Sequence, residues 1–342
     1  TPTPVPWYLA EKAPYLIVLL VGVLGFVLSL LLTPLLKAWG LALLRAVAGI
    51  GKGGRFRVAY RDALVEEHRN LNIRGLKTRT PVAVELEKVY ISLRAESPER
   101  LLEERAAGRS YSIGEVLARH ERLAITGAPG SGKTTLLAYL TLAFARDRAL
   151  DRLGLPEKRL PLLVPLRRLT AALPSAAHPA LTFPAFLTAY YDSLGLHPPP
   201  TFFEDRLRAG QCAVLLDGLD EVASEPERRA LAEWVDRLVT VYPRNRFVVT
   251  SRPAGYESAP LQNGFTVYSV RDFEPAQVEQ FARNWCLAVE IAAQGADNPT
   301  ARRKAASDAG DMIAAIRKSD AIRRLAVNPL LLSIIALVHR YR

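Results

Sequence analysis

The sequence predicts an α/β protein in which helices cover both faces of an open parallel sheet, with a small helical domain after the sheet and one membrane-spanning helix before it. Three observations predict this organisation. Residues 15–36 form an uncharged apolar run, β-rich runs alternate with helical stretches from about residue 122, and the pattern turns wholly helical beyond residue 274. With 342 residues, 49% hydrophobic and 23% charged, the chain can build a large core. The composition excludes a collagen and a coiled coil, and two cysteines exclude a disulfide framework.

The run over 15–36 is 22 residues long, enough at ~1.5 Å per residue to cross a hydrocarbon core of roughly 30 Å. Before it, Glu11 and Lys12 cancel, whereas residues 37–79 after it carry ten Lys or Arg and three acidic residues, a net +7 of the chain's +11. Because positive flanks stay in the cytoplasm, we expect a single-pass protein of the plasma (inner) membrane with residues 1–14 outside.

The basic juxtamembrane segment and linker over 37–81 have two readings. Their position beside the span favours attraction of residues 37–79 to anionic membrane lipids. Nucleic acid is the alternative partner for such a basic run, but nothing else in the sequence indicates it.

An N-terminal arm over 82–121 precedes the sheet domain over 122–272 and the helical domain over 273–342. The arm alternates loosely over 82–94 and is expected to add a strand or an extended segment. The predicted strands are Leu123–Thr126, Leu162–Pro165, Ala213–Asp217, Phe247–Ser251 and Phe265–Val270, and the predicted helices are Lys133–Arg148, Pro184–Leu194, Phe203–Ala209, Glu227–Val241, Pro275–Val289, Ala301–Arg317 and Leu330–Arg340.

A GxxxxGK[ST] motif follows the first predicted strand and opens the next helix, which is the context that a phosphate-binding P-loop needs. Its residues, with the one after it, are Gly127, Ala128, Pro129, Gly130, Ser131, Gly132, Lys133, Thr134 and Thr135. The glycines allow backbone N–H groups to turn toward phosphate oxygens at a helix N-terminus. The Lys133 charge suits the β- and γ-phosphates and the Thr134 hydroxyl suits Mg²⁺, so the sequence predicts a P-loop NTPase sheet.

A second acidic motif ends the strand Ala213–Asp217. Asp217 is placed to ligate Mg²⁺ at the carboxyl edge of the sheet. Asp220 and Glu221 follow as candidates for the catalytic base that activates water, and the sequence leaves the choice between them open.

One strand and its helix separate the two motif strands in the chain, which favours the additional-strand class of P-loop NTPase, with Phe247–Ser251 inserted between them. Thr250 or Arg252 is then expected at the γ-phosphate, and Arg252 is a candidate catalytic residue. The alternative is a strand cap and an ordinary surface arginine.

With these residues in place, the chain resembles the NACHT family of STAND nucleotide switches. The resemblance rests on GAPGSGKTT at 127–135, LLDGLDE at 215–221, TSRP at 250–253 and VNPLLL at 327–332, and runs from about residue 82 to 342. It implies that Pro329 packs on adenine. It also implies that the winged-helix and sensor domains of a full member are missing from this sequence, which leaves the helical domain incomplete.

Members of this family hold ADP in a closed monomer, exchange it for ATP on sensing a trigger ligand, and oligomerise to activate an N-terminal effector. Together with the span predicted at 15–36, the resemblance implies a membrane-anchored, slowly ATP-hydrolysing signalling switch that forms a homo-oligomer when activated, with a role in bacterial anti-phage innate immunity. The trigger ligand is unknown. The alternatives are a constitutive membrane-associated P-loop ATPase and a nucleotide-responsive scaffold with little turnover. No LSGGQ-like or NKxD segment occurs, which argues against a transporter ATPase and a GTPase.

Overall fold

A computed structural model describes residues 53–71, 84–97, 110–170 and 182–340. The chain divides into two compact units, Thr1–Arg57 and Val58–Arg342, and the architecture below is that of the second unit. The predicted segments over 1–14 and 15–36, and most of the basic segment over 37–81, lie outside the described residues. Within the described residues, none of the helices combines the length and the apolar character needed to cross a membrane.

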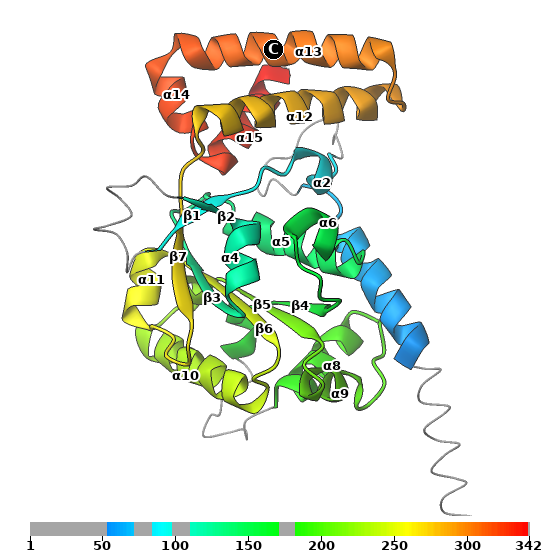
Figure 1. Cartoon of the computed structure of the whole chain (residues 1–342), viewed down its shortest axis with the longest axis vertical. Helices are drawn as coiled ribbons and strands as arrows, with labels where there is room; N and C mark the ends of the chain where they lie inside the picture. The colour runs from blue at the N-terminus through cyan, green and yellow to red at the C-terminus, as the bar shows by residue number, and fades with distance from the viewer. Residues whose placement is uncertain (1–52, 72–83, 98–109, 171–181, 341–342) are drawn as a thin grey trace, which may run out of the picture. The chain divides into compact units, whose positions relative to one another are not determined.

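A seven-stranded sheet forms the centre of the unit, in the order β2-β1-β7-β3-β6-β5-β4 (Figure 1). Five strands run parallel: β3 (Arg122–Thr126), β4 (Leu160–Pro165), β5 (Cys212–Asp217), β6 (Arg246–Ser251) and β7 (Thr266–Val270). These match the five predicted strands to within two residues at each end. β6 lies between β3 and β5, which confirms the strand insertion of the additional-strand class.

The central strands are continuous apolar runs because both faces of the sheet are covered. All of β6 is buried, as is β5 up to Leu216. The helix α5 (Lys133–Ala145) packs against β4 and β5 and is buried on most of its surface. It ends three residues before the predicted end at Arg148.

The prediction for the arm was incomplete. Instead of one loose strand, the arm contains the short helix α2 (Leu86–Val89) and the strand β1 (Arg94–Glu96), and β2 (Tyr111–Ser112) then pairs with β1. β1 pairs antiparallel with β7, so the sheet has two strands more than the five expected. α4 (Ile113–Arg119) follows, started by a capping box in which Ser112 and Glu115 bond each other's backbone N–H.

The remaining helices of the sheet domain lie on the connections between strands. Those predicted are α8 (Phe183–Ser193), α9 (Phe202–Arg208) and α10 (Glu225–Val241), and those not predicted are α6 (Ala149–Leu153), α7 (Leu166–Leu169), the 3₁₀ turn η2 (Leu219–Glu221) and α11 (Pro253–Ser258). The unpredicted ones are seven residues or shorter, too short for a hydrophobic period to be read.

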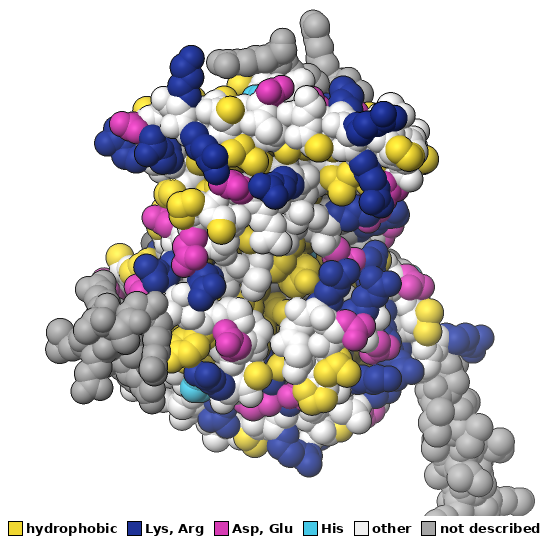
Figure 2. Space-filling model, turned by 45° about the horizontal axis from the view of Figure 1, so that its top comes forward, with side chains coloured by type: hydrophobic (Ala, Val, Ile, Leu, Met, Phe, Trp, Pro, Cys, Tyr) yellow, Lys and Arg dark blue, Asp and Glu magenta, His cyan; other side chains and the backbone are white. Residues whose placement is uncertain are grey.

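The helical domain consists of α12 (Pro275–Gln294), α13 (Pro299–Lys318), α14 (Asp320–Ala326) and α15 (Pro329–Arg340). α12 and α13 lie side by side, and α14 leads into α15 (Figure 1). α14 was not predicted as a separate helix. Lys and Arg side chains spread over the surface of this domain, interspersed with Asp and Glu (Figure 2).

A helix that includes residues 58–68 precedes the sheet and is fixed to it by Tyr60, whose side chain is fully buried. The Tyr60 hydroxyl donates to the carbonyl oxygen of Pro161 at 2.7 Å and contacts the Tyr191 hydroxyl at 3.1 Å. Arg61 donates to the Phe144 carbonyl at 3.0 Å. Residues 69–71 then pair with residues 84–86 through backbone hydrogen bonds of 2.8 Å, which holds this segment in place.

Candidate nucleotide site

The phosphate loop connects β3 to α5, and its backbone conformation depends on glycine. Gly130 and Gly132 have φ of +77° and +90°, in the left-handed region that side chains disfavour. At Gly127 the constraint is space, because a Cβ there would lie 2.7 Å from the Ser131 hydroxyl. The three glycines of the motif are therefore needed for the shape of the loop.

Lys133 lies against this loop. Its Nζ donates to the carbonyl oxygens of Gly127 and Ala128 at 2.7 and 3.1 Å. Burial lowers the pKa of the Lys133 ammonium from its ordinary value, while Asp220 acts in the opposite direction. The lysine is thus held at the loop, where a phosphate group would compete for the same hydrogens.

Asp217 and Thr250 form the best-defined polar contact of the site. The Thr250 hydroxyl donates to Asp217 Oδ1 at 2.6 Å and accepts the Gly218 N–H at 2.9 Å. Thr250 is fully buried, so these two bonds fix the side-chain orientation of Asp217. Thr250 also lines the pocket, and its expected position at the γ-phosphate stays a prediction.

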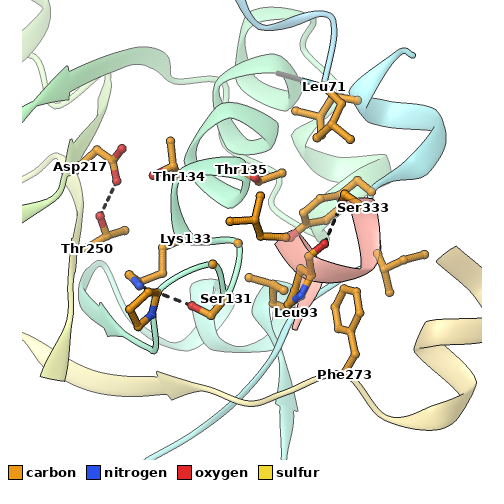
Figure 3. A pocket seen from close by; sticks show the side chains of 18 of the residues that line it. Leu71, Leu93, Ser131, Lys133, Thr134, Thr135, Asp217, Thr250, Phe273 and Ser333 are labelled. Atoms are coloured by element: carbon orange, nitrogen blue, oxygen red, sulfur yellow. Dashed lines mark hydrogen bonds between the residues drawn. The ribbon is translucent and has the colours of Figure 1, made fainter. Parts of the chain in front are cut away.

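Thr134 lies on the same side of the pocket as Asp217, Thr250 and Lys133 (Figure 3). A hydroxyl and a carboxylate are the hard oxygen donors that suit Mg²⁺, an ion that usually keeps several water ligands and binds substrate phosphates. Among the residues that the structure describes, no group of three or more His, Cys, Asp or Glu side chains could hold a metal ion by itself, at this site or at any other. The donor set at Thr134 and Asp217 therefore fits the predicted ion.

The two candidate bases have different partners. Asp220 is mostly buried, with 12% of its side chain exposed, and pairs with the Arg252 guanidinium at 3.0 Å. It also accepts the backbone N–H of Arg252 at 2.9 Å. A Cβ on Gly255 would lie 2.5 Å from the Asp220 Cβ, so α11 packs directly on this carboxylate. Asp220 thus holds the start of α11 in place through Arg252, and both residues line the pocket.

Glu221 instead reaches toward α7. Its Oε2 lies 2.7 Å from Nη1 of Arg167, and the Glu221 side chain is 37% exposed. Gly218, with φ of +77°, leaves room for this side chain, since a Cβ there would lie 2.9 Å from the Glu221 Cγ. Arg167 was not identified as a site residue from the sequence, where it lies two residues beyond the second predicted strand.

An apolar wall completes the pocket, which has a volume of about 490 Å³. The wall combines residues from the arm and the segment before it with residues from the helical domain: Leu71, Leu86, Val89, Tyr90, Ile91, Leu93, Phe273, Phe281, Pro329 and Leu330 (Figure 3). Pro329 lines the pocket, and its expected contact with adenine stays a prediction. The other wall residues were not singled out from the sequence. The signals available were the loose alternation over 82–94 and, for Leu330, the VNPLLL segment over 327–332.

All the residues of the predicted site come together in or beside this one pocket. Its lining includes Pro129 to Thr135 of the phosphate loop, together with Asp217, Asp220, Glu221, Arg252 and Pro329. Gly127 and Ala128 join the loop to β3 and accept the hydrogen bonds of Lys133. A volume of this size is in the range of small-molecule and cofactor sites.

Comparison with known proteins gives one family. Residues 121–288 match the family model of the NACHT domain. No match was found among curated proteins.

Solved structures with a similar arrangement include domain III of the replication initiation protein DnaA from Thermotoga maritima, at 14% identity and a TM-score of 0.33, covering 77% of this chain and 91% of that one. AMPPCP-bound DnaA from Aquifex aeolicus matches at 12% identity and a TM-score of 0.31, over 68% of this chain and 64% of that one. The Orc1 protein of Aeropyrum pernix in complex with DNA matches at 18% identity and a TM-score of 0.33, over 71% and 60% of the two chains. All three TM-scores are below 0.5, so these likenesses carry no further argument. The family match and the site together support a P-loop NTPase domain of the NACHT type at residues 121–288.

Proposed function

We propose that the chain binds ATP and ADP with Mg²⁺ and hydrolyses ATP slowly, as the nucleotide-dependent part of a membrane-anchored signalling switch of the NACHT/STAND type. The observation that carries the proposal is the convergence of the phosphate loop with the Asp217–Thr250 pair in one pocket of about 490 Å³. Adenine is expected against the apolar wall that includes Pro329. When bound, Mg²⁺ would be held by Thr134 and Asp217 and would neutralise charge on the phosphates.

Glu221 is the better candidate for the base, because both carboxylate oxygens of Asp220 are already bonded to Arg252. In the hydrolysis step, a water oxygen bonds to the γ-phosphorus as the bond from that phosphorus to the β–γ bridging oxygen breaks. Glu221 takes a proton from the water and later returns it to solvent, and ADP leaves with the electron pair of the broken bond.

Slow turnover is expected because the Glu221 carboxylate is paired with Arg167 and must leave this partner before it can take a proton. The same pairing favours the second candidate, a nucleotide-responsive scaffold with little turnover. Turnover measured together with oligomer mass, in ADP and in ATP, distinguishes the two. A switch would hydrolyse ATP and change mass with nucleotide, whereas a scaffold would change mass alone.

The remaining parts of the proposal rest on the sequence and the resemblance. They are the single-pass anchor at 15–36 in the plasma membrane, contact of residues 37–79 with anionic lipids, homo-oligomer formation on activation by an unknown trigger, and a role in anti-phage defence. The constitutive membrane-associated ATPase remains the alternative, and it predicts turnover that does not change with oligomer mass.

The nucleotide assignment is tested with Lys133→Ala, which should abolish binding of ATP and ADP in calorimetry because the phosphates lose their point charge. Glu221→Gln should retain binding and lose hydrolysis. Lys318→Ala, an exposed lysine at the end of α13, is the matched control and should bind as the parent does. Equal affinity in the Lys133 variant and the parent would contradict the assignment.

A further inference from the structure

The turn between α14 and α15 lies directly on the phosphate loop. The side-chain Nδ2 of Asn328 donates to the carbonyl oxygen of Pro129 at 3.0 Å, across 199 positions of sequence. The backbone N–H of Leu330 donates to the carbonyl oxygen of Gly130 at 3.1 Å. Two successive carbonyl groups of the loop are thus bonded to the start of α15.

Asn328 uses both ends of its amide. While Nδ2 bonds the loop, Oδ1 accepts the backbone N–H groups of Leu330 and Leu331 at 3.1 and 3.2 Å and so caps α15. The approach is close, because a Cβ on Gly130 would lie 2.7 Å from this Oδ1. Glycine at position 130 therefore serves the contact with Asn328 as well as the positive φ of the loop.

These bonds constrain the part of the loop that would hold phosphate. In a planar trans peptide the C=O and the following N–H point in opposite directions, so fixing the carbonyls of Pro129 and Gly130 also fixes the planes of the N–H groups after them. Successive N–H groups of this kind form the anion-binding nest of a phosphate loop. A loop ordered before the ligand arrives loses less conformational entropy on binding and holds its ligand longer.

The same turn also places Pro329, Leu330 and Ser333 in the pocket wall. Asn328 therefore joins the part of the pocket that faces phosphate to the part contributed by the helical domain. If the Asn328 hydrogen bond is lost, the phosphate loop and the wall residues at the start of α15 are no longer held at a fixed distance from each other.

We propose that Asn328 is a positioning residue that pins the phosphate loop to α15 and thereby slows the release of nucleotide. This inference rests on the proposed nucleotide function and adds a residue that neither the P-loop motif nor the family match identifies.

The test replaces Asn328 with serine in the full chain. Serine can still cap α15 but is too short to reach Pro129, and it adds no charge next to the phosphates. Stopped-flow release of a fluorescent ADP analogue should become about five-fold faster, the ~1 kcal/mol of one net hydrogen bond. The matched control is Asn298→Ser, at the cap of α13, where Oδ1 accepts the Ala301 N–H at 2.8 Å. α13 contributes no described residue to the pocket, so this variant should release ADP at the parent's rate.

A second measurement needs no nucleotide. Hydrogen exchange of the peptide over residues 127–132 in the nucleotide-free chain should be about five-fold faster in Asn328→Ser and unchanged in Asn298→Ser. Parent-like exchange in the Asn328 variant, or equal acceleration in both variants, would overturn the proposal. If the parent bound no nucleotide, the proposed function would fail, and the exchange rates would still decide the role of Asn328.

Discussion

The two neighbouring carboxylates of the site differ most clearly in how firmly they are held. Asp220 is buried and bonded through both oxygens, to the backbone and to the side chain of Arg252. Glu221 makes one ion pair, with Arg167, and the two side chains are 37% and 47% exposed. A pair this exposed contributes about 0.2–1 kcal/mol. The Glu221 carboxylate can therefore be released at small cost, whereas that of Asp220 cannot.

Removal of Arg167 should increase ATP turnover. In Arg167→Ala the Glu221 carboxylate loses the cation that holds it toward α7, so we expect kcat to rise about three- to five-fold, the equivalent of ~1 kcal/mol or less, with KM unchanged. Steady-state kinetics with saturating Mg²⁺ measures this effect, and Arg167→Lys should restore most of the parent's rate.

The matched control for that experiment is the next residue of the same helix. Arg168 places its guanidinium over the Tyr190 ring at 5.3 Å from the centroid. Arg168→Ala removes the same charge from α7 and leaves the Arg167–Glu221 pair in place, so its kcat should match that of the parent. A similar rise in both variants would point to helix stability or surface charge and would contradict the specific role of Arg167.

The phosphate loop and Asp217 could be located from the sequence alone, because each is a local pattern. The loop lies between one strand and the start of one helix, and Asp217 ends a single apolar strand. Thr250, Arg167 and Asn328 could not be assigned their roles in this way. Each acts through a partner that the fold brings from more than 30 positions away, 199 in the case of Asn328. Side-chain partners of this kind depend on tertiary packing, which spacing does not encode.

Polar contacts fix α15 at both ends. Its start contacts the phosphate loop, and Arg340 near its end pairs with Glu290 of α12. Glu290 is only 1% exposed and also accepts a hydrogen bond from Lys304 of α13 at 2.9 Å. Burial by itself raises the pKa of the Glu290 carboxyl, but the bonds from Lys304 and Arg340 more than offset it, and the net direction is down. This carboxylate therefore ties three helices together.

Glu290→Gln should destabilise the helical domain by about 1–3 kcal/mol, because two cations lose a buried partner. A carboxyl group whose pKa is lowered on folding contributes stability above its unfolded pKa, and that contribution is lost as the pH falls through the lower folded value. The difference in unfolding free energy between parent and variant should thus be full near pH 7 and shrink below about pH 4.3. Urea unfolding followed by circular dichroism across this range measures it.

Glu279→Gln provides the comparison on the same helix. Glu279 pairs with Arg283 and Arg317, but its side chain is 26% exposed and those of both partners are 68% exposed. Its substitution should cost well under the Glu290 value, on the order of 0.5 kcal/mol. Equal losses at the two positions would show that burial of Glu290 is not the source of its effect.

At the scale of elements, the prediction was accurate for the five parallel strands and the long helices because these have long apolar runs or a clear helical period. It was incomplete at the edge of the sheet, where one strand or an extended segment was expected over 82–94 and the structure adds the two strands β1 and β2. β1 and β2 are three and two residues long, which is too short for any alternation to register. β1 pairs with the edge of β7 and β2 pairs with β1, and a sequence pattern does not show which segment will pair with such an edge.

Across the whole molecule, the two cysteines make a topology experiment simple. Cys212 and Cys286 are both buried and free. Burial raises the pKa of these thiols to about 12 and about 11, respectively, so neither forms the reactive thiolate readily at neutral pH. A cysteine introduced at the surface should therefore label without interference from the native pair.

Pro2→Cys should react with a membrane-impermeant maleimide in intact cells, because the positive charge that follows residue 36 favours an N-terminus outside. Lys318→Cys, exposed on the helical domain, should react only after lysis. Labelling of Pro2→Cys only after lysis would contradict the proposed orientation, and labelling of both variants in intact cells would contradict a cytoplasmic NTPase domain.

The attachment of the helix over 58–68 also determines how the molecule carries mechanical force. Along the chain, tension applied from the N-terminal side reaches Tyr60 and Arg61 before it reaches Leu71, which lines the nucleotide pocket. Tyr60 is bonded to the edge strand β4 and Arg61 to the end of α5, so the load passes to these two elements of the sheet domain. Force applied at the N-terminus should reach Leu71 and the pocket only after the hydrogen bonds of Tyr60 and Arg61 have broken.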